Sequence, residues 1–100
     1  MVCADLNLYK KKSKRWQGLG PSLFCIQDIA AATENILLTV TALGLGACWV
    51  GAFREEKAKK ALNLPNSLKP MVLIPVGQTK SKGKPPLRKL LKDLIYYESF

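Results

Sequence analysis

The chain has 100 residues, which is enough for one domain or for part of one. Its apolar fraction of 48% argues against a wholly disordered protein. The net charge of +9 favours an anionic partner, such as a phosphate group or a nucleic acid, although a solvated basic surface explains it equally well.

The N-terminal segment predicts a short strand followed by a basic connection. Residues 1–6 (MVCADL) read as a strand, and Tyr9–Pro21 carries five Lys and Arg residues without a helical period. Its glycines and Pro21 argue against a helix there. Trp16 lies within this run, so the run could hold a nucleic-acid backbone and stack a base. We favour the simpler interpretation, a surface loop.

The longest apolar stretch predicts a buried helix. Asp28 is its expected N-cap, because a carboxylate can accept hydrogen bonds from the free N–H groups of the first turn. Gly44 is the expected end, because it adopts positive φ without a Cβ clash. Apolar residues recur at helical spacing between these ends: Ile29, Ala32, Ile36, Val40 and Leu43. The other faces are apolar too, so we expect burial on more than one side.

A membrane span is the alternative for this stretch. No charged residue occurs from Ile36 to Phe53, which approaches the length that a spanning helix needs. Gly44 and Gly46 interrupt the stretch in the middle, however. We therefore expect a helix, a turn and a strand rather than one spanning helix.

The second half of the chain predicts two strands and two helices. The expected elements are a buried strand at Ala47–Ala52, a helix at Arg54–Leu64, a buried strand at Lys69–Gly77 interrupted near Pro75, a basic loop at Thr79–Pro86 and an amphipathic helix at Leu87–Glu98. Strands alternate with helices along the whole chain. By itself this order would suggest a small α/β unit with a parallel sheet.

Catalytic and metal-binding side chains are scarce. The three cysteines (Cys3, Cys25 and Cys48) are far apart, and the chain has no CxxC pair and no histidine, so we expect no zinc site. Cys3 and Cys48 fall in predicted strands, where we expect small core residues. The start of the chain lacks the apolar segment of a secretory leader, so we expect a cytoplasmic protein. A cofactor is expected to carry any catalysis.

The pattern from Asp28 to Gly77 resembles the nitroreductase-like flavoproteins. Members of that family share an aspartate, an alanine-rich helix with a central Asn, ALGLG, a W-[IV]-G-x-F strand, a short helix ending in LxLP and a P-[IV]-G strand end. This chain matches at Asp28, Ala31, Ala32, Asn35, Leu38, Ala42 to Gly46, Trp49, Gly51, Phe53, Leu62, Leu64, Pro65, Pro75, Val76 and Gly77.

The resemblance implies an α+β fold with a mixed, mainly antiparallel sheet flanked by helices, in place of the parallel sheet. It also implies FMN bound at the interface of an intertwined homodimer, with NAD(P)H as the hydride donor and a nitroaromatic, a quinone or a similar compound as the acceptor. Trp49 and Val50 would then lie against the flavin ring, and a backbone N–H at Gly51 or Ala52 would reach flavin N5. The nearest candidates for the FMN phosphate are Lys84 and Arg88.

The chain departs from the family in its length. Residues 1–100 are expected to form a single nitroreductase-like domain that lacks the family's N-terminal half, which carries an arginine-rich phosphate-binding turn. The apolar helix would then lack part of its cover, which predicts a homodimer, a higher homo-oligomer or a partner chain. The alternative function is a non-catalytic module that acts through such association. Nucleic-acid binding ranks last, because no nucleic-acid fold motif accompanies the charge.

Overall fold

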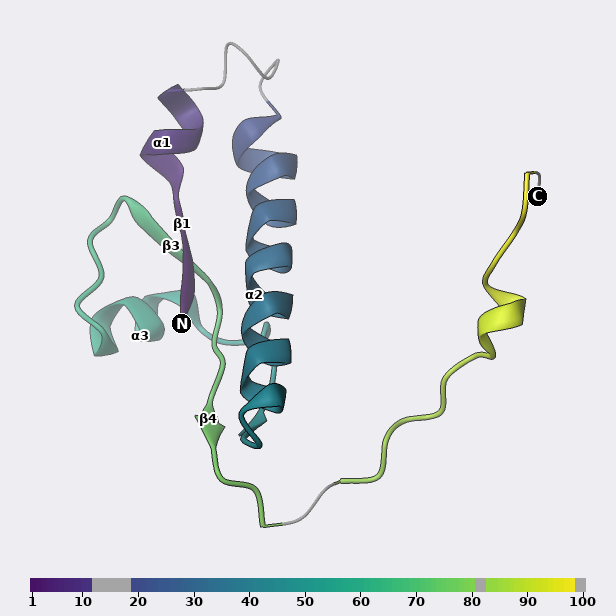
Figure 1. Ribbon diagram of the computed structural model, residues 1–100. Coiled ribbons are helices and arrows are strands. Elements are labelled where there is room, and N and C mark those ends of the chain that lie inside the picture. The colour runs from purple at the N-terminus through teal and green to yellow at the C-terminus, as the bar shows by residue number, and fades with distance from the viewer. Residues whose placement is uncertain (12–18, 81–82, 99–100) are drawn as a thin grey trace.

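The computed structural model describes residues 1–11, 19–80 and 83–98 (Figure 1). Strand β1 (Val2–Asp5) leads directly into helix α1 (Leu6–Lys11). Asp5 Oδ1 accepts hydrogen bonds from the Asn7 and Leu8 N–H groups at 3.0 and 3.2 Å, so Asp5 caps α1. The predicted strand is confirmed. The prediction that no helix enters the basic connection is wrong, and the part of that connection at residues 12–18 lies outside the described residues.

A long helical stretch follows. A π-helical turn, η1 (Gly20–Phe24), continues into α2 (Cys25–Ala42). Pro21 is tolerated there because proline lacks a backbone N–H, and the N–H groups of a helix's first turn have no partner within the helix. The prediction that Asp28 is the N-cap is therefore wrong. Asp28 lies in the first turn of α2, where its negative charge interacts favourably with the helix dipole. The helix ends as predicted before Gly44, which has a φ of +72°.

The strands form two small antiparallel sheets. β1 pairs with β3 (Leu68–Val72), and β2 (Gly46–Ala47) pairs with β4 (Val76–Gly77). This arrangement agrees with the antiparallel sheet expected from the resemblance and not with a parallel α/β unit. The buried strand predicted at Ala47–Ala52 is wrong, because β2 shares only Ala47 with that range and the range is mostly exposed. The strand predicted at Lys69–Gly77 is split into β3 and β4. The split contains Pro75, which cannot donate a ladder hydrogen bond.

Of the two helices predicted in the second half, one is present. α3 (Glu55–Ala61) is confirmed and carries an ion pair between Glu55 and Lys59 at 3.1 Å. The prediction of a helix at Leu87–Glu98 is wrong, because that region contains only the short 3-10 turn η2 (Leu91–Asp93). A short isolated helix is marginal in water, and the apolar face here meets no surface, with Leu87 102% exposed.

We name residues 83–98 the C-terminal arm. All of them are exposed. In Figure 1 the chain leaves β4 beside the end of α2 and runs away from the rest of the molecule, so that the C-terminus lies far from both sheets.

The core lies between α2 and the β1–β3 sheet. Its buried residues are Ala4, Cys25, Ile29 and Val72. Cys25 is thus the buried cysteine, whereas Cys48 is exposed and lies beyond β2, so its predicted core position is wrong. The β2–β4 pair lies outside the core cluster, and Ala47 of β2 is itself exposed. Cys3 in β1 is partly buried.

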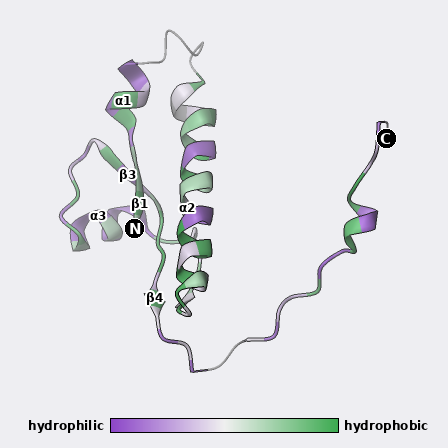
Figure 2. Ribbon diagram, viewed as in Figure 1, coloured by the Kyte–Doolittle hydropathy of each residue, from purple (hydrophilic) through white to green (hydrophobic). Residues whose placement is uncertain are grey.

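The opposite side of α2 is uncovered in this chain. Four residues spaced along that side are all exposed, namely Ala31, Asn35, Leu38 and Ala42, and we name them the outer face of α2. Leu38 is 60% exposed. Figure 2 shows hydrophobic residues at intervals along the whole helix. Among the described residues, burial of α2 on more than one side is therefore not reached.

One helical stretch, Ser22–Ala42, is long and apolar enough to cross a membrane by length and composition. The core helix of a soluble protein meets the same criteria, and this stretch has a buried side. Thr33 is fully buried on that side, and its hydroxyl donates to the Ile29 carbonyl at 2.7 Å. The apolar run at residues 36–53 is interrupted at Gly44, as predicted.

Candidate functional site

The segment Trp49–Phe53 is held in place by a single β-bridge. The Val50 N–H donates to the Leu73 carbonyl at 2.9 Å, and the Leu73 N–H donates to the Val50 carbonyl at 3.0 Å. Leu73 directly follows β3. The segment is therefore anchored to the centre of the fold although it belongs to neither sheet.

This bridge determines where the Gly51 N–H points. The Val50 carbonyl and the Gly51 N–H belong to one planar trans peptide unit, so they point in opposite directions. Since the carbonyl faces Leu73, the Gly51 N–H faces away from it. No described residue accepts a hydrogen bond from this N–H. Gly51 therefore presents a backbone donor that a ligand can use.

An aromatic side chain lies beside this donor. Trp49 and Gly51 are two residues apart in an extended segment, so they share one side of it. A Cβ atom built on Gly51 would meet the Trp49 Nε1 at 3.6 Å, and the Trp49 side chain is 42% exposed. Ala52 follows and is also exposed. A flat group can therefore approach the backbone closely next to the indole.

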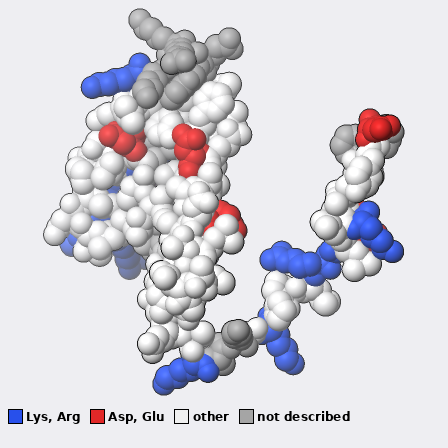
Figure 3. Space-filling model, viewed as in Figure 1, with Lys and Arg blue, Asp and Glu red and all other residues white. Residues whose placement is uncertain are grey.

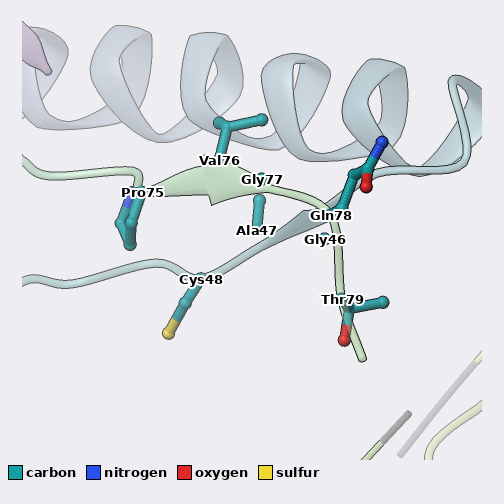
Figure 4. Close-up of a pocket in the computed structure, with 8 residues that line it drawn as sticks. All are labelled: Gly46, Ala47, Cys48, Pro75, Val76, Gly77, Gln78 and Thr79. Atoms are coloured by element: carbon teal, nitrogen blue, oxygen red, sulfur yellow. The ribbon is translucent and has the colours of Figure 1, made fainter. Parts of the chain in front are cut away.

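A pocket of about 410 Å³ adjoins this segment along the chain. It is lined by Gly46, Ala47, Cys48, Pro75, Val76, Gly77, Gln78 and Thr79. Figure 4 shows the Cys48 and Thr79 side chains pointing away from α2, while Val76 points towards the helix. Four of these lining residues, Gly46, Pro75, Val76 and Gly77, belong to the family-matching motifs, although the sequence by itself did not place them in a pocket. The pocket arises because β2 and β4 pair, which brings two distant segments together.

The family-matching Asp28 has a structural partner. The Tyr9 hydroxyl donates to Asp28 Oδ2 at 2.6 Å, which ties α1 to α2. This hydrogen bond, together with burial and the charge of Asp28, raises the pKa of Tyr9 to about 12. Burial, with a smaller contribution from Asp28, also raises the pKa of the Cys25 thiol, which favours a neutral core thiol.

We expect Tyr9→Phe to destabilise the fold by about 1 kcal/mol, because it removes a hydrogen bond to a charged acceptor. The folded pKa of about 12 exceeds the ordinary value of 10.0. The hydroxyl therefore contributes fully below pH 10 and loses its contribution as the pH rises to about 12. Urea unfolding of both proteins, from neutral pH upward, should show their stability difference shrinking in that window. A difference that stays constant through the window would contradict this role.

Lys84 and Arg88 lie on the C-terminal arm and are exposed. Because the arm runs away from the sheets in Figure 1, the structure does not bring these two cations together with Trp49, Val50, Gly51 and Ala52. The predicted site residues therefore fall into two separate groups, the segment Trp49–Ala52 beside the sheets and the exposed basic arm.

Comparison with known proteins identifies the family. The model of the nitroreductase family matches residues 10–78. A protein of Archaeoglobus fulgidus, provisionally named NADH dehydrogenase/NAD(P)H nitroreductase, is 34% identical over 86 residues, which cover 82% of this chain and 44% of that protein. The FMN reductase (NADPH) of Bacillus subtilis is 32% identical over an alignment of 110 positions, which covers 99% of this chain and 43% of that protein.

Solved structures show the same fold. A protein of Bacteroides thetaiotaomicron, again provisionally named NADH dehydrogenase/NAD(P)H nitroreductase, superposes with a TM-score of 0.71 at 30% identity, covering 99% of this chain and 53% of that one. A nitroreductase family protein of Streptococcus pneumoniae has a TM-score of 0.77 at 24% identity, covering 92% and 46%. The chain thus spans about half the length of the relatives it matches. With its α+β fold and its match over residues 10–78, this chain belongs to the nitroreductase family.

Proposed function

We propose that this chain is part of an FMN-dependent NAD(P)H oxidoreductase. The observation that carries the proposal is the Gly51 peptide, which offers an unpaired N–H beside an exposed indole in the segment that matches the family's flavin-contacting strand. The similarity to an FMN reductase (NADPH) supports both FMN and a nicotinamide donor. When bound, FMN would supply the hydride chemistry between NAD(P)H and a nitroaromatic, quinone or similar acceptor.

The residues of the segment Trp49–Ala52 are suited to contact the flavin ring of FMN. The N5 atom of an oxidised flavin is a hydrogen-bond acceptor, and the Gly51 N–H is a donor that no described residue uses. The missing Cβ at Gly51 lets the ring reach the backbone closely. Trp49, Val50 and Ala52 would flank the ring. These residues would orient the cofactor and exclude water from one side of it.

The phosphate side of the cofactor needs groups beyond this segment. We propose that Lys84 and Arg88 contact the phosphate, because they are the cations nearest in the chain to the position of the family's basic pair. We further propose that residues 1–100 are one portion of a nitroreductase domain and that the family's N-terminal half completes the phosphate site. The coverage of about half of each relative supports this proposal. The expected setting is a cytoplasmic homodimer.

The test is a visible absorption spectrum of the purified protein before and after FMN is added and excess is removed by desalting. We expect a retained flavin band, and quenched flavin fluorescence in a titration. Riboflavin, which lacks the phosphate, is the matched control and should bind more weakly if cations contact the phosphate. A protein that stays colourless and leaves FMN fluorescence unchanged at every concentration would contradict the proposal.

A second candidate is a non-catalytic module that acts through association. The uncovered outer face of α2 favours it, since Leu38 is 60% exposed on a helix with apolar residues along its length. Contiguous exposed apolar surface commonly marks an interaction site. The absorption test separates the two candidates, because only the oxidoreductase needs flavin.

A further inference from the structure

We propose that Lys57 and Lys60 of α3 bind the 2′-phosphate of NADPH and thereby favour NADPH over NADH as the hydride donor. This inference rests on the proposed function, because it places the nicotinamide of the donor against a flavin at Gly51. It goes beyond that function because it gives the donor a phosphate site of its own, apart from the cations of the C-terminal arm.

Helix α3 presents two lysines on its exposed side. It packs against β3, and the residues of its inner side, Glu55, Ala58 and Lys59, are only partly exposed. Lys57 and Lys60 are both exposed, and a spacing of three residues places their side chains next to each other. Neither of them forms an ion pair with a described residue. Their two ammonium groups are therefore available to hold one anion between them.

The other charged residues of α3 differ from this pair. Lys59 Nζ lies 3.1 Å from Glu55 Oε1, so its charge is already matched. Glu56 is exposed and lies four residues before Lys60, but it forms no ion pair with any described residue. Its carboxylate would repel a phosphate bound nearby. The helix therefore contains both the proposed cations and the residues that serve as controls for them.

The position of α3 suits the far end of a dinucleotide. Gly51 lies three residues before Arg54, so the chain between them spans at most about 11 Å. The helix begins directly after Arg54 and rises about 1.5 Å per residue, so Lys57 and Lys60 lie about 5 and 9 Å further along its axis. An NADPH molecule whose nicotinamide lies at Gly51 can reach these lysines with the phosphate at its other end.

A second basic surface suits a reaction that joins two phosphate-bearing molecules. FMN and the donor must lie against each other for hydride transfer, and each brings its own phosphate groups. The proposed function assigns Lys84 and Arg88 of the arm to FMN. Figure 3 shows basic side chains along the arm and also at the lower left of the molecule, where Figure 1 places α3. The 2′-phosphate distinguishes NADPH from NADH, and its negative charge favours charge-assisted hydrogen bonds from two adjacent ammonium groups.

The test is isothermal titration calorimetry of the full chain at low ionic strength with two nucleotides, adenosine 2′,5′-bisphosphate and adenosine 5′-monophosphate. These probes differ only in the 2′-phosphate, and neither needs a bound flavin. We expect the bisphosphate to bind at least about tenfold more tightly, because charge-assisted hydrogen bonds hold the extra phosphate. Lys57→Gln and Lys60→Gln should each remove most of this difference.

Two further variants of α3 are the controls. Lys59→Gln removes the same charge from the same helix, but from a lysine that is paired with Glu55, so it should keep the full difference. Glu56→Gln removes a repelling carboxylate, and we expect it to strengthen binding of the bisphosphate by about twofold. Such a gain in affinity would not result from a loss of fold. In flavin-loaded protein, Lys57→Gln should raise the KM for NADPH and leave the KM for NADH unchanged.

Three results would overturn the inference. Equal affinity for the two nucleotides would show that the chain does not recognise the 2′-phosphate. A difference that survives both Lys57→Gln and Lys60→Gln would place the phosphate on other cations. A loss in Lys59→Gln as large as that in Lys57→Gln would reduce the effect to net charge.

The proposed function is tested separately, because the absorption test follows flavin and the titration follows the 2′-phosphate. A protein that retains FMN but binds both nucleotides equally would refute only the 2′-phosphate site. A colourless protein that still distinguishes the nucleotides would refute flavin binding and leave that site in place.

Discussion

Gly51→Val is expected to weaken FMN binding by at least tenfold, or about 1.4 kcal/mol, while the fold stays intact. The bridge between Val50 and Leu73 directs the Gly51 N–H away from Leu73, and a branched side chain on Gly51 would hinder a flat ligand from approaching that donor closely. The fold should tolerate the change, because a Cβ on Gly51 meets its nearest atom, the Trp49 Nε1, at an ordinary 3.6 Å. Fluorescence titration with FMN measures the loss, and circular dichroism checks the fold.

Ala61→Val is the matched control for this substitution. Ala61 is exposed at the end of α3 and lines neither the Trp49–Phe53 segment nor the pocket. It should therefore leave FMN affinity close to that of the wild type. Equal losses in the two variants would mean that Gly51 has no special role, and unchanged affinity in Gly51→Val would count against the proposed ring contact.

Ile29→Ala is expected to lower the free energy of unfolding by about 3 kcal/mol, the range found when a large aliphatic residue is removed from a core. Ile29 is 9% exposed and packs with Ala4, Cys25 and Val72 between α2 and the β1–β3 sheet. This cluster holds α2 to the sheet. Urea denaturation followed by far-ultraviolet circular dichroism gives the difference.

Ile26→Ala serves as the control on the same helix. Ile26 is 53% exposed, so truncating it removes far less buried apolar surface. Its expected cost is below about 1 kcal/mol. A loss as large as that of Ile29→Ala would show that Ile26 is covered in solution, which would place another surface over this part of α2.

The family assignment makes the uncovered surface of this chain informative. The matched relatives are about twice as long, and the structure exposes apolar residues on α2 and on the C-terminal arm. Neither Leu38 of α2 nor any residue of the arm belongs to the core cluster.

The sequence by itself determined the elements whose signals are local. The three- and four-residue apolar spacing predicted α2, Gly44 predicted its end, and an amphipathic pattern predicted α3. Pro75 predicted the interruption between β3 and β4. The motifs around Trp49 and Gly51 identified the family, which the comparison confirmed. These features depend on neighbouring residues only, and so they can be read from the chain.

The tertiary structure alone decided the features that depend on distant residues. The direction of the Gly51 N–H follows from the bridge to Leu73, and the pocket follows from the pairing of β2 with β4. Asp28 looked like a helix cap, but its strongest contact is with Tyr9 from α1. The apolar period at Leu87–Glu98 predicted a helix that is absent, because an amphipathic helix gains most of its stability from a surface to pack against, and this chain does not supply one.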